Sequence, residues 1–185
     1  MQHHNPGARE LFRGGLASTT LRTTLVCALS LSAWWLFMFW HPQHFRRLLA
    51  EAHVPAGEIT QLVSLSFLLV NVLAIAGNFA GGCLAKRLGN RRAIVLMCAG
   101  LGAAIVGAFA VPRGFAALAW FWCPLAGFFS GVFGLFTMYL PPLFPTLLRT
   151  TGAGFCYNFG RILAAGGTVY FGLTTAGQVG DYGKA

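Results

Sequence analysis

Five long apolar runs alternate with short polar connections along the chain. None of the five contains Asp or Glu, and each is at least as long as the ~17 residues that an α-helix needs to cross a bilayer. The pattern predicts an all-α integral membrane protein with a transmembrane domain at residues 21–176. Its five spans are expected at about residues 24–40, 59–85, 93–112, 114–140 and 151–175.

The segments outside the runs are polar and short. Residues 1–20 are expected to form a cytoplasmic leader with one short interfacial helix near Glu10 to Phe12, and residues 177–185 a short external tail. A polar loop is predicted from His41 to Glu58, and an outer turn at 112–114.

Prolines and threonines set the expected limits of the last two spans. Pro124 predicts a kink, because a proline ring removes a helical hydrogen bond. Three later prolines predict that the fourth span ends near Leu140 and that a non-helical cytoplasmic connection follows: Pro141, Pro142 and Pro145. Thr150 and Thr151 offer an N-cap for the fifth span.

The connection from Gly82 to Arg92 holds the densest positive charge in the sequence. A short basic connection between apolar runs is typical of the cytoplasmic side of a membrane. With five spans, eight basic residues lie inside (Arg9, Arg13, Arg22, Lys86, Arg87, Arg91, Arg92, Arg149) and four outside (Arg46, Arg47, Arg113, Lys184). We therefore expect a multi-pass protein of the cell membrane, with a cytoplasmic N-terminus and an external C-terminus.

Composition agrees with a membrane protein, because only 9% of the residues are charged and 56% are hydrophobic. Nucleic acid is not an expected partner, since the +9 net charge lies in short connections. Neither a disulfide framework nor a metal centre is expected. The five cysteines lie in or beside apolar runs without C-x-x-C spacing, and His41, His44 and His53 are predicted in a solvated loop.

Small residues recur four positions apart in several runs, for example Gly127 with Gly131 and Gly160 with Ala164. Such spacing lets membrane helices approach closely, and it predicts tight packing of the bundle.

Two tracts carry a resemblance to a known family. Gly82-x-Leu84-Ala85-Lys86-Arg87-x-Gly89-Asn90-Arg91 is similar to the major facilitator superfamily signature G-x-L-x-D-R-x-G-R-R, which lies between the second and third helices of each six-helix half. Residues 140–161, LPPLFPTLLRTTGAGFCYNFGR, resemble the connection between helices ten and eleven in proton-coupled metabolite symporters of that superfamily. The resemblance implies that the chain corresponds to helices seven to eleven of a twelve-helix transporter.

Two positions depart from the family pattern. Lys86 stands where the signature has an acid, and Pro142 stands where related sequences have a glutamate that would pair with Arg149. The cytoplasmic gate that the resemblance implies comprises Gly82, Lys86, Arg87, Gly89, Arg91, Arg92 and Arg149, and it lacks these local acids.

The resemblance implies a permease for a small organic solute such as an organic acid or a sugar, coupled to protons. The expected partners are the lipid bilayer, the solute, protons, and a second half-transporter chain or a homodimer. The alternative is a membrane protein without transport, either a degenerate transporter fragment or a half-bundle that binds other membrane proteins. No catalytic constellation or cofactor motif is present in the sequence, so we expect neither an enzyme nor a cofactor.

Arg161 is the one charge predicted deep in a span, ~15 Å from its start at Thr151. A charge at that depth is a functional candidate. Tyr157 and Asn158 precede it on the same helical face. Two interpretations remain open: Arg161 holds a substrate carboxylate that Tyr157 and Asn158 orient, or it bonds to backbone carbonyls or a neighbouring helix.

A polar stripe runs along the second span, where Ser64, Asn71 and Asn78 are seven residues apart. It is expected either to form hydrogen bonds between helices or to line a cavity. Trp34, Trp35 and Trp40 are expected to anchor the first span at the outer interface.

Overall fold

The computed structural model describes residues 8–179, with side chains as far as residue 174. Of the predicted external tail at residues 177–185, residues 177–179 belong to a helix and residues 180–185 lie outside this range. The described part is helical nearly throughout and contains no strand. It divides into two compact units, residues 8–39 with 140–179 and residues 40–139, and helix α1 (Gly15–Glu51) contributes to both.

The first unit contains α1 as far as Phe39, the 3-10 turns η1 (Ala8–Phe12), η3 (Pro141–Leu143) and η4 (Thr146–Leu148), and α7 (Arg149–Val179). Its core lies where the segments that precede α1 and α7 pack on α7, and there Leu11, Phe144 and Leu148 are buried together with Cys156 of α7. The Thr20 hydroxyl donates to the Leu11 carbonyl at 2.8 Å, which ties η1 to α1.

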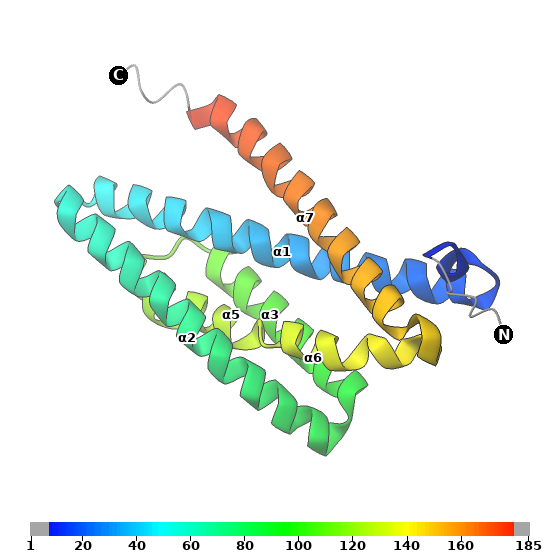
Figure 1. Ribbon diagram of the computed structural model, residues 1–185. Helices are drawn as coiled ribbons and strands as arrows, with labels where there is room; N and C mark the ends of the chain where they lie inside the picture. Colours follow the sequence, from blue (N-terminus) through cyan, green and yellow to red (C-terminus); the bar gives the residue numbers. More distant parts are fainter. Residues whose placement is uncertain (1–7, 180–185) are drawn as a thin grey trace. The chain divides into compact units, whose positions relative to one another are not determined.

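Helices α1 and α7 run in the same direction within this unit (Figure 1). Their contacts advance together along both sequences, from the Cys156 thiol, which donates to the Thr20 carbonyl at 3.6 Å, to Gly160 against the backbone of Cys27 and Ala28. At this second point a Cβ on Gly160 would lie 3.0 Å from the Ala28 nitrogen. The absent side chain therefore lets the two helices pack closely.

The second unit contains α2 (Ala56–Leu88), α3 (Asn90–Phe109), α4 (Phe115–Ala117), the π-helical turn η2 (Leu118–Trp122), α5 (Cys123–Phe129) and α6 (Val132–Tyr139), together with the end of α1. Glycines make its closest contacts. Gly127 lies against Val70 of α2, and Gly131 lies against Gly77. The predicted packing through small residues is confirmed at these positions.

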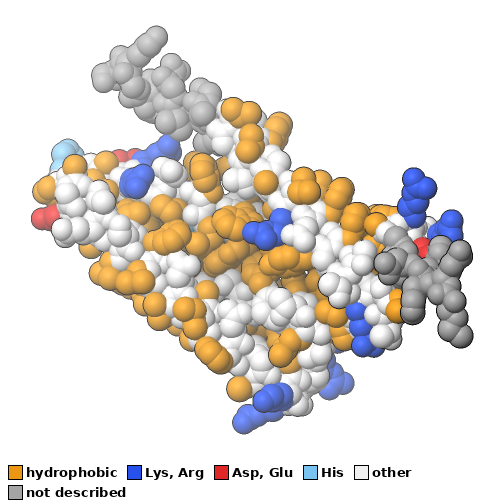
Figure 2. Space-filling view, in the orientation of Figure 1, with side chains coloured by type: hydrophobic (Ala, Val, Ile, Leu, Met, Phe, Trp, Pro, Cys, Tyr) orange, Lys and Arg blue, Asp and Glu red, His pale blue; other side chains and the backbone are white. Residues whose placement is uncertain are grey.

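Among the described residues, four helical segments are long and apolar enough to cross a membrane: Gly15–Glu51, Ala56–Leu88, Asn90–Phe109 and Phe115–Tyr139. Many large apolar side chains point outward from them, among them Phe79 at 73% and Val95 at 61% exposure (Figure 2). Surfaces of this kind suit lipid. Helix α7, the counterpart of the fifth predicted span, is 31 residues long but less apolar, because it contains Asn158, Arg161 and seven glycines.

The first helix corrects two predictions. Helix α1 begins at Gly15, inside the predicted leader, and continues through Pro42 to Glu51, so the loop predicted from His41 is wrong. Phe45 and Leu49, four residues apart, are both buried, and their burial compensates for the hydrogen bond that Pro42 cannot donate. His41 is buried between the Phe45 and Phe67 rings and is not in a solvated loop.

The fourth predicted span ends where its prolines predict, whereas the predicted kink and N-cap differ in detail. Helix α6 ends at Tyr139, as expected, and the prolines after it lie in or beside two short 3-10 turns. Pro124 lies in the first turn of α5, directly after the π-helical turn, so the helix is irregular there. The predicted N-cap is wrong, because Thr150 and Thr151 lie inside the first turn of α7.

Candidate functional site

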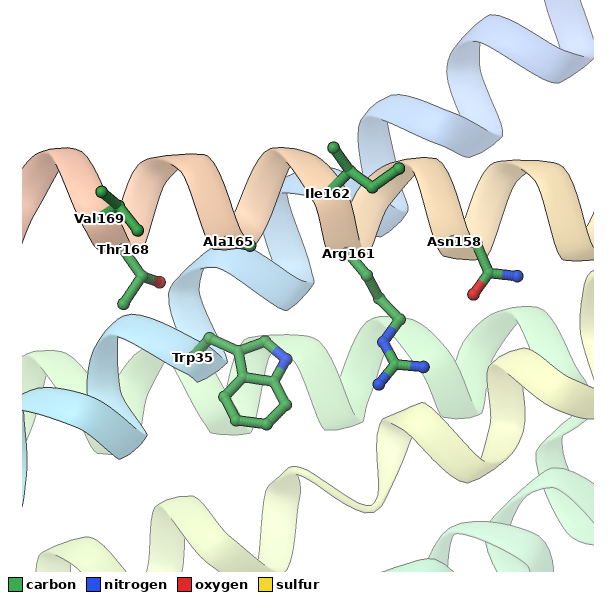
Figure 3. Close-up of a pocket in the computed structure, with 7 residues that line it drawn as sticks. All are labelled: Trp35, Asn158, Arg161, Ile162, Ala165, Thr168 and Val169. Atoms are coloured by element: carbon green, nitrogen blue, oxygen red, sulfur yellow. The ribbon is translucent and has the colours of Figure 1, made fainter.

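A groove of about 640 Å³ lies beside the close contact of α1 with α7. Trp35 lines it from α1, and Asn158, Arg161, Ile162, Ala165, Thr168 and Val169 line it from α7 (Figure 3). The α7 residues that line the groove follow Asn158 by three, four, seven, ten and eleven positions, which places them along one side of the helix. All the lining residues belong to the first unit.

Arg161 is the only charged residue of this groove. Its side chain and that of Asn158 point from α7 toward the side on which the Trp35 indole lies (Figure 3). The guanidinium is exposed and has no hydrogen-bond or ion-pair partner in the described part of the chain. The alternative in which Arg161 bonds to backbone carbonyls or to a neighbouring helix is therefore not what the described residues show.

Asn158 and Thr168 leave hydrogen-bonding capacity toward the groove. The Asn158 amide nitrogen donates to the Gly154 carbonyl at 2.9 Å, and the Thr168 hydroxyl donates to the Ala164 carbonyl at 2.9 Å. Each side-chain oxygen can still accept a hydrogen bond, and the amide of Asn158 has a second N–H to donate. The groove thus combines one cation, two polar groups and an apolar wall.

The structure brings together part of the predicted site. Asn158 lies with Arg161 as predicted, whereas Tyr157 is half-buried and does not line the groove. Trp35, expected as an interface anchor, is 47% exposed and forms one wall. Trp34 instead packs on Phe37, with ring centroids 5.4 Å apart.

Asn71 and Asn78 belong to the second unit and are not residues of the groove. Each amide nitrogen donates at 2.8 Å to the carbonyl four residues earlier in α2, at Phe67 and Ala74. The Asn78 amide also lies against Gly134 of α6. The bonds of this stripe are therefore within its own helix, and Asn78 adds a packing contact between helices.

The basic connection is a turn of one residue, because α2 ends at Leu88 and α3 begins at Asn90. Gly89 joins them at φ 82° and ψ 152°, a backbone region that side chains disfavour, and its N–H donates to the Ala85 carbonyl at 2.9 Å. Gly82 lies in α2 with open space beside it. Arg149, the last residue of the predicted gate, begins α7 in the first unit.

The two pairs of cations at this turn have opposite relations to their helices. Lys86 and Arg87 lie in the last turn of α2, where cations are favourable, whereas Arg91 and Arg92 lie in the first turn of α3, where cations are unfavourable. All four side chains are exposed, and within residues 8–179 none forms an ion pair.

Comparison of the chain with protein-family models, with curated proteins and with solved structures found no match. The groove and the basic turn are therefore the features from which a function can be argued.

Proposed function

We propose that the chain is a membrane-embedded part of a secondary transporter of the major facilitator type, and that it carries small organic acids. In this proposal Arg161 binds the carboxylate of the solute. The observation that carries it is the exposed Arg161 guanidinium in a largely apolar groove, without a partner in the described residues. A cation on a membrane helix is costly unless an anion or water reaches it, and a solute carboxylate supplies that anion.

The geometry of the groove suits an acid with an apolar body. A guanidinium binds a carboxylate through two parallel hydrogen bonds, and Asn158 lies one helical turn away to add a third. Trp35, Ile162 and Val169 offer the surface against which an aromatic or branched aliphatic body would pack. A sugar would leave the charge of Arg161 unpaired, so acids are the favoured solutes.

The direction of the helices supports the five-span arrangement in this proposal. A chain that crosses a membrane at α1, α2, α3, the segment 115–139 and α7 returns to its first direction at the fifth crossing. The parallel course of α1 and α7 agrees with this alternation. The one-residue basic turn between α2 and α3 agrees with a short cytoplasmic connection.

Coupling to protons would need acidic groups outside the described spans. Glu51 ends α1, Glu58 lies in the first turn of α2, and Glu10 lies in η1, so none lies in the middle of an apolar segment. We therefore propose that any proton site is contributed by a second half-transporter chain.

Binding and transport can be measured separately. The chain purified in detergent should bind radiolabelled benzoate more tightly than benzyl alcohol, which lacks the carboxylate. Arg161→Gln should weaken benzoate binding about 10–100-fold, as expected when a hydrogen-bonded charge pair is lost, while Arg46→Gln, an exposed cation outside the groove, should leave it unchanged. Equal binding of benzoate by the Arg161→Gln variant would refute the proposed site.

Lys86 and Pro142, which replace acids of the family pattern, favour the second candidate, a membrane protein without transport. Vesicles that contain the chain separate the two functions. Accumulation of benzoate that disappears in Arg161→Gln supports transport, whereas binding to the purified chain without accumulation supports a half-bundle that does not transport alone.

A further inference from the structure

A second hollow lies in the second unit, at the basic turn between α2 and α3. It measures about 480 Å³ and is lined by Leu88, Arg91, Arg92, Val95 and Leu96. Blue cationic atoms gather at this end of the second unit, where α2 meets α3 (Figure 2). The apolar lining is open to the surroundings, since Leu88, Val95 and Leu96 are 41%, 61% and 50% exposed.

The charges and the apolar side chains of this hollow are arranged in order along α3. Arg91 lies one turn before Val95, and Arg92 lies one turn before Leu96, so each cation is ~6 Å nearer the helix end than the apolar side chain below it. Helix α3 is long and apolar enough to cross a membrane. A crossing along α3 would put its first turn at the edge of the hydrocarbon core and Val95 and Leu96 one turn deeper.

No acid of this unit balances the cations. Between residues 40 and 139 the acidic residues are Glu51 and Glu58, and Glu58 is 30 residues before Leu88, ~45 Å along α2. Arg91 and Arg92 form no ion pair within the described residues and also lie at the unfavourable end of the α3 dipole. Two guanidinium groups without an ion-pair partner among the described residues are therefore available to an anion from outside the chain.

We propose that this hollow binds an anionic phospholipid of the cytoplasmic leaflet. The phosphate accepts hydrogen bonds from Arg91 and Arg92, and an acyl chain covers Val95, Leu96 and Leu88. The order of charge above apolar surface matches the order of headgroup above acyl chain in a lipid. Free phosphate would satisfy the arginines but would leave the apolar lining uncovered, so the lipid is the better complement.

The consequence is a preference for particular lipids that does not depend on transport. Each basic residue near an anionic leaflet favours binding by about fivefold, so the pair should contribute about 30-fold. Lys86 and Arg87, on the neighbouring end of α2, would strengthen the general attraction without lining the hollow.

Native mass spectrometry of the full chain in detergent tests the proposal, with phosphatidylglycerol and phosphatidylcholine of identical acyl chains added in turn. Phosphatidylglycerol should bind more tightly. The double variant Arg91→Gln/Arg92→Gln should lose this preference about 30-fold, while Arg46→Gln/Arg47→Gln, an adjacent exposed pair with the same charge, should retain it. Circular dichroism checks that both variants fold, and Arg91→Lys/Arg92→Lys should keep most of the preference even where the glutamine pair misfolds.

Three results would overturn the proposal. Equal loss in the two glutamine pairs would mean that only total charge matters, and unchanged preference in Arg91→Gln/Arg92→Gln would place the lipid elsewhere. Displacement of phosphatidylglycerol by millimolar inorganic phosphate would mean that the hollow is a site for a free anion.

Discussion

Replacement of Gly77 by alanine should destabilise the second unit, because Gly77 is where α2 and α5 approach most closely. A Cβ on Gly77 would overlap the backbone carbonyl of Phe128, and a Cβ on Gly131 would overlap the backbone of Gly77. A side chain can rotate away from such an overlap, but backbone atoms cannot. The two helices would therefore have to separate.

Two opposite terms set the magnitude. Overpacking of a close-packed contact costs about 1–3 kcal/mol, and rigid backbone on both sides places Gly77→Ala near the upper end of that range. Exchange of a helical glycine for alanine returns about 0.5–1 kcal/mol. The net loss is about 2 kcal/mol, or ~30-fold in the ratio of folded to unfolded chains. Gly82→Ala is the matched control, since Gly82 lies in the same helix with open space beside it. It should gain about 0.5–1 kcal/mol.

A thermal ramp in detergent with a thiol-reactive fluorophore measures the difference. Cys123, at the start of α5, is fully buried and becomes reactive only when the unit opens. A loss of 2 kcal/mol corresponds to a Tm about 4–8 °C lower in a chain of this length. The packing described for α2 and α5 would be refuted if Gly77→Ala unfolded at or above the temperature of Gly82→Ala.

Three further substitutions test local features by the same thermal ramp. Pro42→Ala should raise Tm by the equivalent of about 1–3 kcal/mol, because it restores a hydrogen bond inside a continuous helix; no change would favour the loop. Gly89→Ala should cost about 1–3 kcal/mol, because φ 82° with ψ 152° suits only glycine, and a neutral result would contradict that turn. Gly160→Val should lower Tm through its contact with Ala28, with Cys156 as the buried probe, whereas Gly166→Val, which has open space beside it, should not.

The sequence predicted most reliably where one strong local signal acts alone. The second and third apolar runs became α2 and α3, and the basic tract with Gly89 became the turn between them. The prolines after Leu140 ended α6 because a missing N–H cannot be supplied by any neighbour.

Tertiary contacts decided the features that local signals did not predict. The first span was expected to end at Trp40 and a polar loop to begin at His41, but burial of Phe45 and Leu49 carries the helix on to Glu51. Phe45 and Leu49 are four positions apart, and this helical spacing of apolar residues was the signal that could have predicted the extension.

The candidate site was predictable only on one of its two helices. Asn158 and Arg161 lie three residues apart on α7, so their shared side follows from helical geometry. Trp35 is more than 120 residues away in sequence, and nothing local predicts that α1 would supply a wall of the same groove. Tyr157 lies four residues before Arg161 and therefore on the same helical face, but it is half-buried and the groove extends only from Asn158 onward along α7, which the helical spacing alone does not predict.

Access of water to the groove is the property that separates a solute site from a lipid-facing surface, and thiol labelling in bilayers measures it directly. The experiment uses a chain in which Cys83 and Cys98 are replaced by Ser. Ala165→Cys places a thiol in the groove. Leu173→Cys is the control, because Leu173 is 71% exposed and lies outside the groove. We predict that a charged, membrane-impermeant thiosulfonate labels the first variant, that benzoate slows this labelling, and that the second variant is not labelled. Absence of labelling at residue 165, or labelling that benzoate does not slow, would contradict the assignment of the α1 and α7 groove as a binding site for organic acids.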